Sequence, residues 1–443
     1  MRGKIVLAIS VALLVIAMGL GMGFYVFKNI LDTDFIYRGV KIDGYDLGNK
    51  TVEQALEYLR DKKEAKLEGK HMDLLYDDWI YELELRDLDF TYDYAKALGE
   101  AFGVGREGSY IHRIRTIRRA RKGVNISLKS YYNVDKINEI VSHIAKEINR
   151  NPLDAHIYIS DGEIVISDEE LGIRVLEDEL TLKISDNIYL LEDISIPVEN
   201  LKTRLTKAYL SRINGVIGEY STSFKGSSNS RIENISLSAQ AISNYLVLPG
   251  EEFSYNNTTG PRSIESGYKE ANVIIGGELT PGLGGGVCQT STTMYNALLL
   301  SDLTILERHP HSIPASYVPY GQDAAVAYGY LDLKFRNDFD FPILTYAELV
   351  GDKLNIYVYG DKDARDYGVK ITAQIVEVIR PDTEILFDMS LEPNERVDIQ
   401  KGRIGYRVVT YKSILKDGEE MSKELITKDH YRKRNHIYKI GPE

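Results

Sequence analysis

The chain has 443 residues, of which 54 are lysine or arginine and 66 are aspartate or glutamate, giving a formal net charge of -12. This acidic balance argues against nucleic acid as a partner, because binding to phosphates needs an excess of cationic side chains. A single cysteine excludes an intramolecular disulfide, so ordinary hydrophobic cores must hold the domains together. The length is too great for one core and predicts several domains.

The N-terminus carries Arg2 and Lys4, and the stretch Ile5–Phe27 that follows contains no charged residue. Such a run is long enough to span a hydrocarbon core of about 30 Å as a helix. The basic residues before it place the N-terminus in the cytoplasm and the rest of the chain outside. A cleaved signal peptide is the alternative, but the run is longer than a usual signal core and lacks a clear cleavage site. We expect residues 1–28 to form a cytoplasmic tip and an uncleaved single-pass membrane anchor.

Residues 29–125 and 126–205 follow one plan twice. The first block predicts, from residue periodicity, the helix Val52–Lys62, the hairpin Asp78–Phe90 and the helix Tyr92–Gly103. The second block predicts the helix Val134–Asn149, the hairpin His156–Ser167, the strand Leu171–Val175 and the helix Glu177–Leu190. The shared order predicts two related α+β modules.

Residues 206–362 predict a β-rich core that contains two helices. The expected helices are Arg231–Leu246 and Gln289–Leu300, and the expected strands are Ser316–Tyr320, Ala324–Phe335, Ile343–Val350 and Lys353–Tyr359. With the two modules before it, this block predicts an α+β multidomain protein. No metal-binding spacing such as HExxH or CxxC occurs in the sequence, so we expect no metal and no other cofactor.

The only cysteine, Cys288, follows the glycine run Gly284–Gly286 and precedes the polar start of an expected helix. Glycines let the backbone approach a substrate and present its N–H groups, and a helix N-terminus favours a thiolate. His309 and His311 follow that helix, and imidazole titrates in the range that the partner of a thiolate needs. The pattern indicates a Cys/His acyl-transfer site. The alternative is that Cys288 is a small buried hydrophobe and that the glycines form only a loop.

The block around Cys288 resembles the VanW domain, a family first named from glycopeptide-resistance gene clusters. The resemblance rests on the segments Leu248–Asn256, Gly260–Arg262, Gly284–Asn296, Glu307–Ser312, Tyr317–Pro319, Gly321–Ala324 and Val326–Asp332. Upstream, the two modules resemble the peptidoglycan-binding modules that commonly precede VanW domains, most clearly in Gly39–Thr51. Downstream, residues 363–443 resemble a G-five domain, a small β-rich module associated with the cell wall, in Gly402–Gly405, Lys416–Glu419 and Asp429–Tyr431.

The resemblance implies an extracytoplasmic cell-wall function, because some membrane-anchored VanW-domain proteins are L,D-transpeptidases. It implies that Cys288 is the nucleophile and that His309 or His311 is its base. The enzyme would join two peptidoglycan stem peptides, a tetrapeptide donor and an amine acceptor, through a thioester and form a 3-3 cross-link. The N–H of Cys288 with Gly285 and Gly286 would supply an oxyanion hole.

Further expectations concern His309, His311, Arg308 and Asp323. His309 and His311 are two residues apart and would face the same side of a strand, so the sequence does not separate them. Arg308 would then face the other way, either as a surface cation or as a binding group for a stem carboxylate. Asp323 would orient the imidazole or serve only as a turn residue.

Two functions of other kinds remain open at this point. An L,D-carboxypeptidase would use the same acyl-enzyme with water as the acceptor, and a non-catalytic scaffold would only bind the wall. A low pKa of an accessible thiol would distinguish an enzyme from a scaffold. Transferase and hydrolase differ in how well the site excludes water, which the sequence does not reveal.

Overall fold

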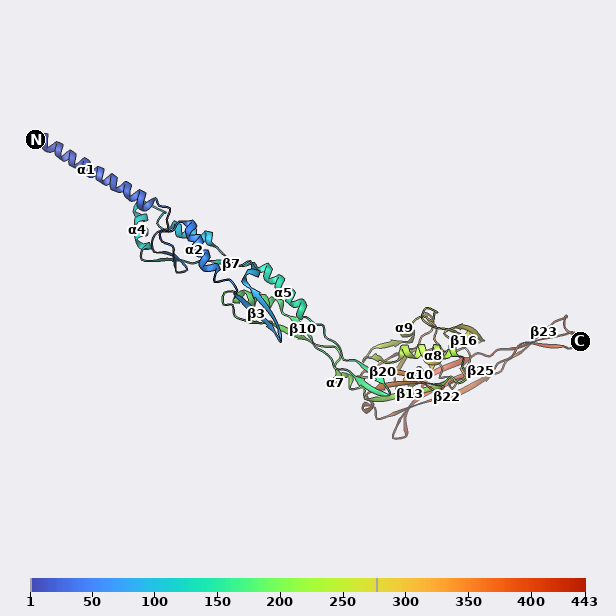
Figure 1. The fold of residues 1–443 in the computed structure, drawn as a ribbon. Helices are drawn as coiled ribbons and strands as arrows, with labels where there is room; N and C mark the ends of the chain where they lie inside the picture. Colours follow the sequence, from blue (N-terminus) through green and yellow to red (C-terminus); the bar gives the residue numbers. More distant parts are fainter. Residues whose placement is uncertain (1, 276–277) are drawn as a thin grey trace. The chain divides into compact units, whose positions relative to one another are not determined.

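The computed structural model describes residues 2–275 and 278–443 (Figure 1). Two compact units make up the chain. The first contains the residues up to Pro152 together with Leu171–Lys202, and the second contains Leu153–Glu170 together with Thr203–Glu443. The chain therefore passes between the two units three times.

The N-terminal helix α1, Arg2–Val26, continues in a π-helical turn, Phe27–Leu31. Gly3–Leu31 is long and apolar enough to cross a membrane, and its most apolar window is not buried against the described part of the chain. A signal sequence near the N-terminus has the same properties. The helix is thus consistent with both alternatives that the sequence left open.

The first core of the first unit packs three helices against a sheet of order β2–β1–β6. Its elements are β1 (Val40–Ile42), β2 (Tyr45–Asp46), α2 (Val52–Glu64), α3 (Tyr94–Gly103), α4 (Tyr110–Ala120) and β6 (Val124–Ile126). Helix α2 starts at a capping box, in which the side chain of Thr51 accepts from the N–H of Gln54 and that of Gln54 accepts from the N–H of Thr51.

The second core of this unit combines two helices with a sheet of order β11–β3–β4. Its main elements are β3 (His71–Tyr76), β4 (Trp79–Glu84), α5 (Val134–Ile148), α6 (Glu177–Asn187) and β11 (Ile194–Ser195). Two small pairs accompany them, β5 (Thr91–Tyr92) with β7 (Ser130–Tyr131) and β10 (Gly172–Val175) with β12 (Val198–Leu201).

The hairpin β3–β4 differs in position from the hairpin expected at Asp78–Phe90. It begins at His71 and turns at Asp77, which has φ 47°. An Asp-Asp turn lacks the glycine that usually marks a hairpin, which is why the sequence pattern placed it too late. The hairpin lies in the sequence of the first module but packs in the core of α5 and α6.

The second unit begins with an analogous hairpin. Strands β8 (Ile157–Ser160) and β9 (Glu163–Ile166) turn at Asp161 and Gly162. They pack beside α7 (Lys207–Leu210) and the main sheet through a cluster that includes Ile157, Leu210 and Leu344. In both modules, then, the hairpin after the first helix packs in a core other than that of its own helix.

The main sheet of the second unit is antiparallel, in the order β13–β21–β20–β14, and its strands are Gly215–Ser223, Lys353–Gly360, Ile343–Val350 and Tyr245–Val247. Helices α8 (Asn229–Ile242) and α10 (Val287–Leu300) pack on this sheet. A Cβ on Gly218 of β13 would lie 2.2 Å from Ser301 Oγ. Glycine at this position therefore lets the strand approach the end of α10.

Smaller elements lie beside α8 and α10. They are a sheet of order β15–β19–β18 (Glu252–Ser254, Lys334–Arg336 and Thr304–Glu307), the hairpin β16–β17 (Glu270–Ile275 and Glu278–Leu283) and the short helix α9 (Tyr255–Thr259). The strand predicted at Ser316–Tyr320 is wrong, because turns occupy this segment. Of the strand predicted at Ala324–Phe335, only β19 at its end forms, with isolated bridges before it.

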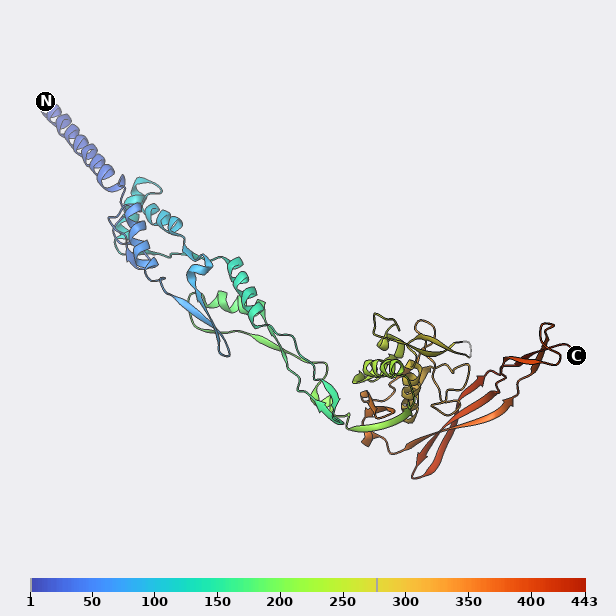
Figure 2. The same cartoon turned by 45° about the vertical axis from the view of Figure 1, so that its right-hand side comes forward.

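The C-terminal part of the second unit is all β (Figure 2). Long strands β22 (Gly368–Ile379), β25 (Gly405–Lys416) and β26 (Glu419–Tyr431) form one sheet in that order. Strands β23 (Thr383–Phe387), β27 (His436–Ile440) and β24 (Arg396–Gln400) form a second sheet. The predicted fold class, α+β multidomain with a small all-β C-terminal domain, is confirmed.

Candidate active site

Helix α10 begins directly after the glycine run and carries Cys288 in its first turn. Gly286 caps the helix with φ 115°, and a Cβ on it would lie 2.9 Å from Arg231 O, so this position requires glycine. Cys288 is partly exposed as a residue, and its thiol donates to Val326 O at 3.4 Å. The sulfur therefore lies at a helix N-terminus, where free N–H groups and the dipole stabilise negative charge.

His311 lies between this thiol and a buried carboxylate. Its Nδ1 is 2.6 Å from Asp323 Oδ2, and its backbone N–H donates to the same oxygen at 2.6 Å. The imidazole lies close enough to the thiol of Cys288 to lower the pKa of that thiol. Because Asp323 holds Nδ1, Nε2 is the nitrogen left to face the sulfur. The carboxylate of Asp323 is 1% exposed and His311 is 6% exposed, so water does not compete for this contact.

Burial opposes charge on all three groups, but their mutual contacts outweigh it. Burial raises the pKa of the Cys288 thiol, but the contact with His311 and its charge lower this pKa by more. The pKa of the thiol is therefore below its ordinary value. Burial lowers the pKa of His311, but hydrogen bonds to Asp323 and Cys288 raise it to about 9. The pKa of Asp323, raised by burial, is lowered more strongly by His311 and Arg308. These shifts therefore favour a thiolate facing an imidazolium over the neutral pair.

The glycine run is held closely from both sides. A Cβ on Gly285 would lie 2.6 Å from Asn272 O of β16, and Gly285 O accepts from Asn234 Nδ2 at 3.0 Å. These contacts fix the backbone that leads into Cys288, whose N–H belongs to the first turn of α10. The role of Gly285 and Gly286 in an oxyanion hole stays a prediction.

The two histidines of the motif have different partners. His309 Nε2 lies 3.1 Å from Glu307 Oε1, and its side chain is 39% exposed. Strand β18 ends at Glu307, so the regular alternation expected for His309 and His311 does not apply. The structure brings Cys288, His311 and Asp323 together and places His309 beside Glu307.

Arg308 is buried, with a side chain only 4% exposed, and is therefore not a surface cation. Its Nε donates to Asp323 O at 2.6 Å, and one terminal nitrogen lies 2.6 Å from Asp429 Oδ1. The other terminal nitrogen lies 3.4 Å from Asp323 Oδ1. The guanidinium of Arg308 thus forms hydrogen bonds to both the backbone and the side chain of Asp323.

Polar side chains of α10 hold the segment that carries Asp323. Ser291 Oγ donates to Ala324 O at 2.7 Å, Thr292 Oγ1 accepts from Ala324 N at 2.9 Å, and Asn296 Nδ2 donates to Gln322 O at 2.8 Å. These bonds satisfy the backbone around Asp323 in place of a neighbouring strand. This is the physical reason why the strand predicted over Ala324–Phe335 does not form at its start.

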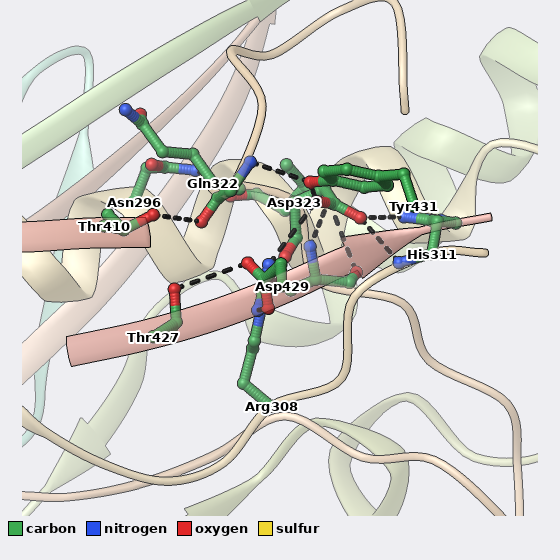
Figure 3. A network of polar contacts seen from close by, with 12 residues as sticks. Asn296, Arg308, His311, Gln322, Asp323, Thr410, Thr427, Asp429 and Tyr431 are labelled. Carbon is green, nitrogen blue, oxygen red and sulfur yellow. Dashed lines mark hydrogen bonds and ion pairs between the residues drawn. The ribbon is translucent and has the colours of Figure 1, made fainter. Parts of the chain in front are cut away.

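Sequence reasoning missed two residues of the C-terminal domain that reach this network. Tyr431 donates to Asp323 Oδ1 at 2.5 Å, and Asp429 pairs with Arg308 (Figure 3). The sequence marked Asp429–Tyr431 only as a feature of a C-terminal domain. Their spacing was the only signal in the sequence, since residues two apart on a strand share a face. This spacing does not identify which part of the chain the two side chains contact.

Arg262 is a further cation close to the thiol that sequence reasoning did not assign to the site. A Cβ on Gly284 would lie 3.0 Å from Cγ of Arg262, so the side chain packs on the glycine run. The guanidinium of Arg262 lies 6.0 Å from the ring of Tyr328. One terminal nitrogen donates to Gly260 O at 3.0 Å. Its positive charge contributes to lowering the pKa of Cys288, after burial and the contacts with His311 and Val326.

Three family models match the chain in the predicted order. They are "Putative peptidoglycan binding domain" over residues 81–192, "VanW like protein" over 230–359 and "G5 domain" over 370–443. The resemblances to a VanW domain, a peptidoglycan-binding domain and a G5 domain are therefore confirmed. The division of the upstream region into two such modules stays a prediction, because one match spans the boundary expected at residue 125. The VanW-like match contains the whole constellation of Cys288, His311 and Asp323.

Two relatives share this region. The chain is 35% identical over 228 residues to the uncharacterized protein YoaR of Bacillus subtilis. This match covers 51% of this chain and 74% of YoaR. It is 32% identical over 137 residues to the vancomycin B-type resistance protein VanW of Enterococcus faecalis. That match covers 30% of this chain and 50% of the relative. The chain belongs to the VanW family. This membership and the peptidoglycan-binding domain point to a function related to the cell wall and to an extracytoplasmic location.

Solved structures of G5 domains are also similar to parts of this chain. A crystal structure of HP0197-G5 is 25% identical, covers 17% of this chain and 100% of its own, and has a TM-score of 0.13. The IgA1 protease G5 domain is 18% identical, covers 18% of this chain and 95% of its own, and has a TM-score of 0.15. At such low TM-scores, the assignment of the C-terminal domain depends on the family model alone.

Proposed function

We propose that this protein is a peptidoglycan L,D-transpeptidase that forms 3-3 cross-links through a thioester on Cys288. The observation that carries the proposal is the series of contacts from the thiol to His311 and from His311 to the buried Asp323. A thiolate with an imidazolium partner that a carboxylate orients is the arrangement that acyl transfer needs. The VanW-like and peptidoglycan-binding matches support stem peptides as the substrates.

In the acylation step, the sulfur of Cys288 attacks the carbonyl carbon of the third residue of a tetrapeptide stem. Negative charge develops on the carbonyl oxygen, where the N–H of Cys288 and the N-terminus of α10 stabilise it. Gly285 and Gly286 let this backbone pack closely against Asn272 and Arg231, which fixes the start of α10. The carbon–nitrogen bond to D-alanine then breaks, His311 Nε2–H donates its proton to the leaving amine, and the acyl thioester remains.

In the second step, the side-chain amine of another stem attacks the thioester. His311 Nε2 accepts the proton of that amine, the new carbon–nitrogen bond forms, and Cys288 leaves as a thiolate. Asp323 holds the proton on Nδ1, so the proton exchange takes place at Nε2 in both steps. We assign the base to His311 rather than to His309, because His309 is hydrogen-bonded to Glu307 instead.

The test uses the full-length chain in detergent with disaccharide tetrapeptides, followed by mass spectrometry of the muropeptides. We expect cross-linked dimers and free D-alanine from the wild type and neither product from Cys288→Ala. Tripeptides without dimers would contradict transfer and indicate an L,D-carboxypeptidase. Stems that are bound but unchanged by the wild type would contradict catalysis and indicate a binding scaffold.

We also propose that α1 is retained as a single-pass anchor with its N-terminus in the cytoplasm. The exposed apolar helix and the basic residues Arg2 and Lys4 at its N-terminal end support this orientation. Mass spectrometry of the membrane-bound protein should recover peptides that begin before Lys28. A mature N-terminus beyond Lys28 would show that the helix is a cleaved signal peptide.

A further inference from the structure

The last buried part of the C-terminal sheet lies against the segment that carries Asp323. Most of β26 is exposed, but Asp429 and Tyr431 near its end are 6% and 0% exposed. On the paired strand β25, Val408 and Thr410 are 1% and 0% exposed. Both strands belong to the same compact unit as the VanW-like domain. One end of this sheet therefore has a buried polar face, which a binding module on its own would leave in water.

Tyr431 extends the series of contacts that starts at the thiol. Its hydroxyl donates to Asp323 Oδ1 at 2.5 Å and accepts from Gly321 N at 2.7 Å (Figure 3). The other oxygen of Asp323 receives both hydrogen bonds from His311. Each oxygen of the carboxylate is thus fixed from a different side, and this fixes the plane in which it meets the imidazole.

The turn that leads into Asp323 is held by the same sheet. Thr410 Oγ1 donates to Gly321 O at 3.1 Å, so both the N–H and the carbonyl of Gly321 are bonded to side chains of the C-terminal domain. A Cβ on Gly321 would lie 2.4 Å from Thr410 Oγ1, and the residue has φ 82°. Only glycine permits this close approach.

Asp429 pairs with Arg308, which would otherwise compete with His311 for Asp323. Arg308 lies between the two carboxylates, at 2.6 Å from Asp429 Oδ1 and 3.4 Å from Asp323 Oδ1, and all three side chains are at most 4% exposed. Because Arg308 has a closer partner in Asp429, it does not draw Asp323 away from His311. A buried guanidinium that lost Asp429 would turn fully to Asp323.

We infer that the C-terminal domain completes the active site, with Tyr431 as a positioning residue that holds Asp323 against His311. The inference rests on the proposed function of Cys288 and His311 and adds to it a domain that the family models treat as separate. Tyr431 and Asp429 do not touch the reacting atoms. They act through Asp323 on the orientation and protonation of the imidazole.

The test measures alkylation of Cys288 by iodoacetamide across pH in the full-length chain, together with kcat and KM for cross-linking. Tyr431→Phe removes one hydroxyl and keeps the ring that packs 5.9 Å from Tyr320. Oδ1 of Asp323 then keeps only the long contact with Arg308 at 3.4 Å, so the carboxylate is no longer fixed in the plane in which it meets His311. We expect the alkylation rate at pH 7 to fall about tenfold and kcat to fall with it, while KM stays unchanged.

The matched control is Tyr411→Phe on β25, where the ring packs beneath Lys423 at 4.9 Å. It removes the same hydroxyl from the same sheet, and we expect alkylation and kcat to equal those of the wild type. Asp429→Asn is the second variant, and its expected loss has the same sign because Arg308 is then free to pair with Asp323. It also serves as the deciding variant if Tyr431→Phe does not fold.

The outcomes separate the inference from the proposed function. Wild-type alkylation with the pH dependence of an ordinary thiol would contradict the activated nucleophile and hence the proposed function. A wild type with a reactive thiolate, with Tyr431→Phe and Asp429→Asn indistinguishable from it, would overturn the inference alone. An equal loss in Tyr411→Phe would also overturn it, because the effect would then be one of packing.

Discussion

Helices α5 and α10 are of similar length, 15 and 14 residues, and each forms part of the core of its own unit, but they bury different kinds of side chain. Helix α5 buries one apolar face, with Ile137, Val141, Ile144 and Ile148, and exposes the other. Helix α10 buries polar residues over about two turns, from Gln289 to Asn296. An apolar face needs only to be covered, whereas each buried polar group needs its own partner. The stability of α10 is therefore tied to the position of the segment that carries Asp323.

The largest effect should come from the histidine that α10 and Asp323 bring to the thiol. We expect His311→Gln to lower kcat/KM about a thousandfold, because general acid and base catalysis at both steps is lost. His309→Gln is the matched control on the same segment, and its pairing with Glu307 at the surface predicts a change of about threefold or less. Cross-linking kinetics of the two variants measure this difference. Equal losses would contradict the assignment of the base.

The sequence allowed the position of Cys288 to be predicted because the signals are local. A glycine run followed by a polar and then an apolar stretch marks a helix start, and α10 begins one residue before the cysteine. The choice between His309 and His311 was not predictable, because it depends on where β18 ends and on contacts with a distant carboxylate. Tyr431 was missed for the same reason, since its contact with Asp323 spans 108 positions of the chain.

The fold shows the same division between local and distant signals. Strands β20 and β21 lie where the sequence predicted them. In β21 the alternating residues Leu354, Ile356 and Val358 pack in the same core as α10. The segment Ser316–Tyr320 was expected to be a strand, but the backbone that follows it is bonded to side chains of α10 and of the C-terminal domain. Alternation of residue types does not reveal hydrogen bonds from side chains to the backbone.

Truncation in α5 tests the apolar side of the comparison. Ile144 is 0% exposed, and we expect Ile144→Ala to cost about 2–5 kcal/mol in local stability, because it leaves a cavity in the core. Hydrogen exchange of peptides from Val134–Ile148 measures the loss. Alkylation of Cys288, which lies in the other unit, should stay at the wild-type rate. A large fall in alkylation would show that the two cores are not independent.

Thr292 tests the polar side, because it is fully buried and bonded to both the N–H and the carbonyl of Ala324. Thr292→Val keeps the shape of the side chain and leaves Ala324 N–H without this acceptor. We expect a cost of about 1–3 kcal/mol in stability and, unlike in Ile144→Ala, slower alkylation of Cys288. The same two measurements apply. A stability loss with unchanged alkylation would show that α10 does not position Asp323.

The pH dependence of kcat/KM should follow the thiolate–imidazolium pair. The pKa of His311 is raised to about 9, so its stabilising charge is present below its ordinary value near 6.5 and is lost as the pH rises through about 9. Activity should fall about tenfold per pH unit above that point, because the leaving amine loses its proton donor. The pKa of Cys288 is lowered, so activity should persist below the ordinary thiol range. Asp323→Asn should move the alkaline limb to lower pH, and an unmoved limb would contradict its assigned role.

The smallest effect should come from Arg262, whose charge acts on the thiol without belonging to the hydrogen-bonded series. We expect Arg262→Gln to slow alkylation of Cys288 at neutral pH by about twofold, because the nearby positive charge that favours the thiolate is removed. Arg262→Lys keeps the charge and should restore the rate, and added salt should reduce the difference between the two variants. A loss that lysine does not restore would indicate that the shape of the guanidinium matters. Restoration by charge alone would distinguish Arg262 from His311 and Tyr431, where the hydrogen bond itself is required.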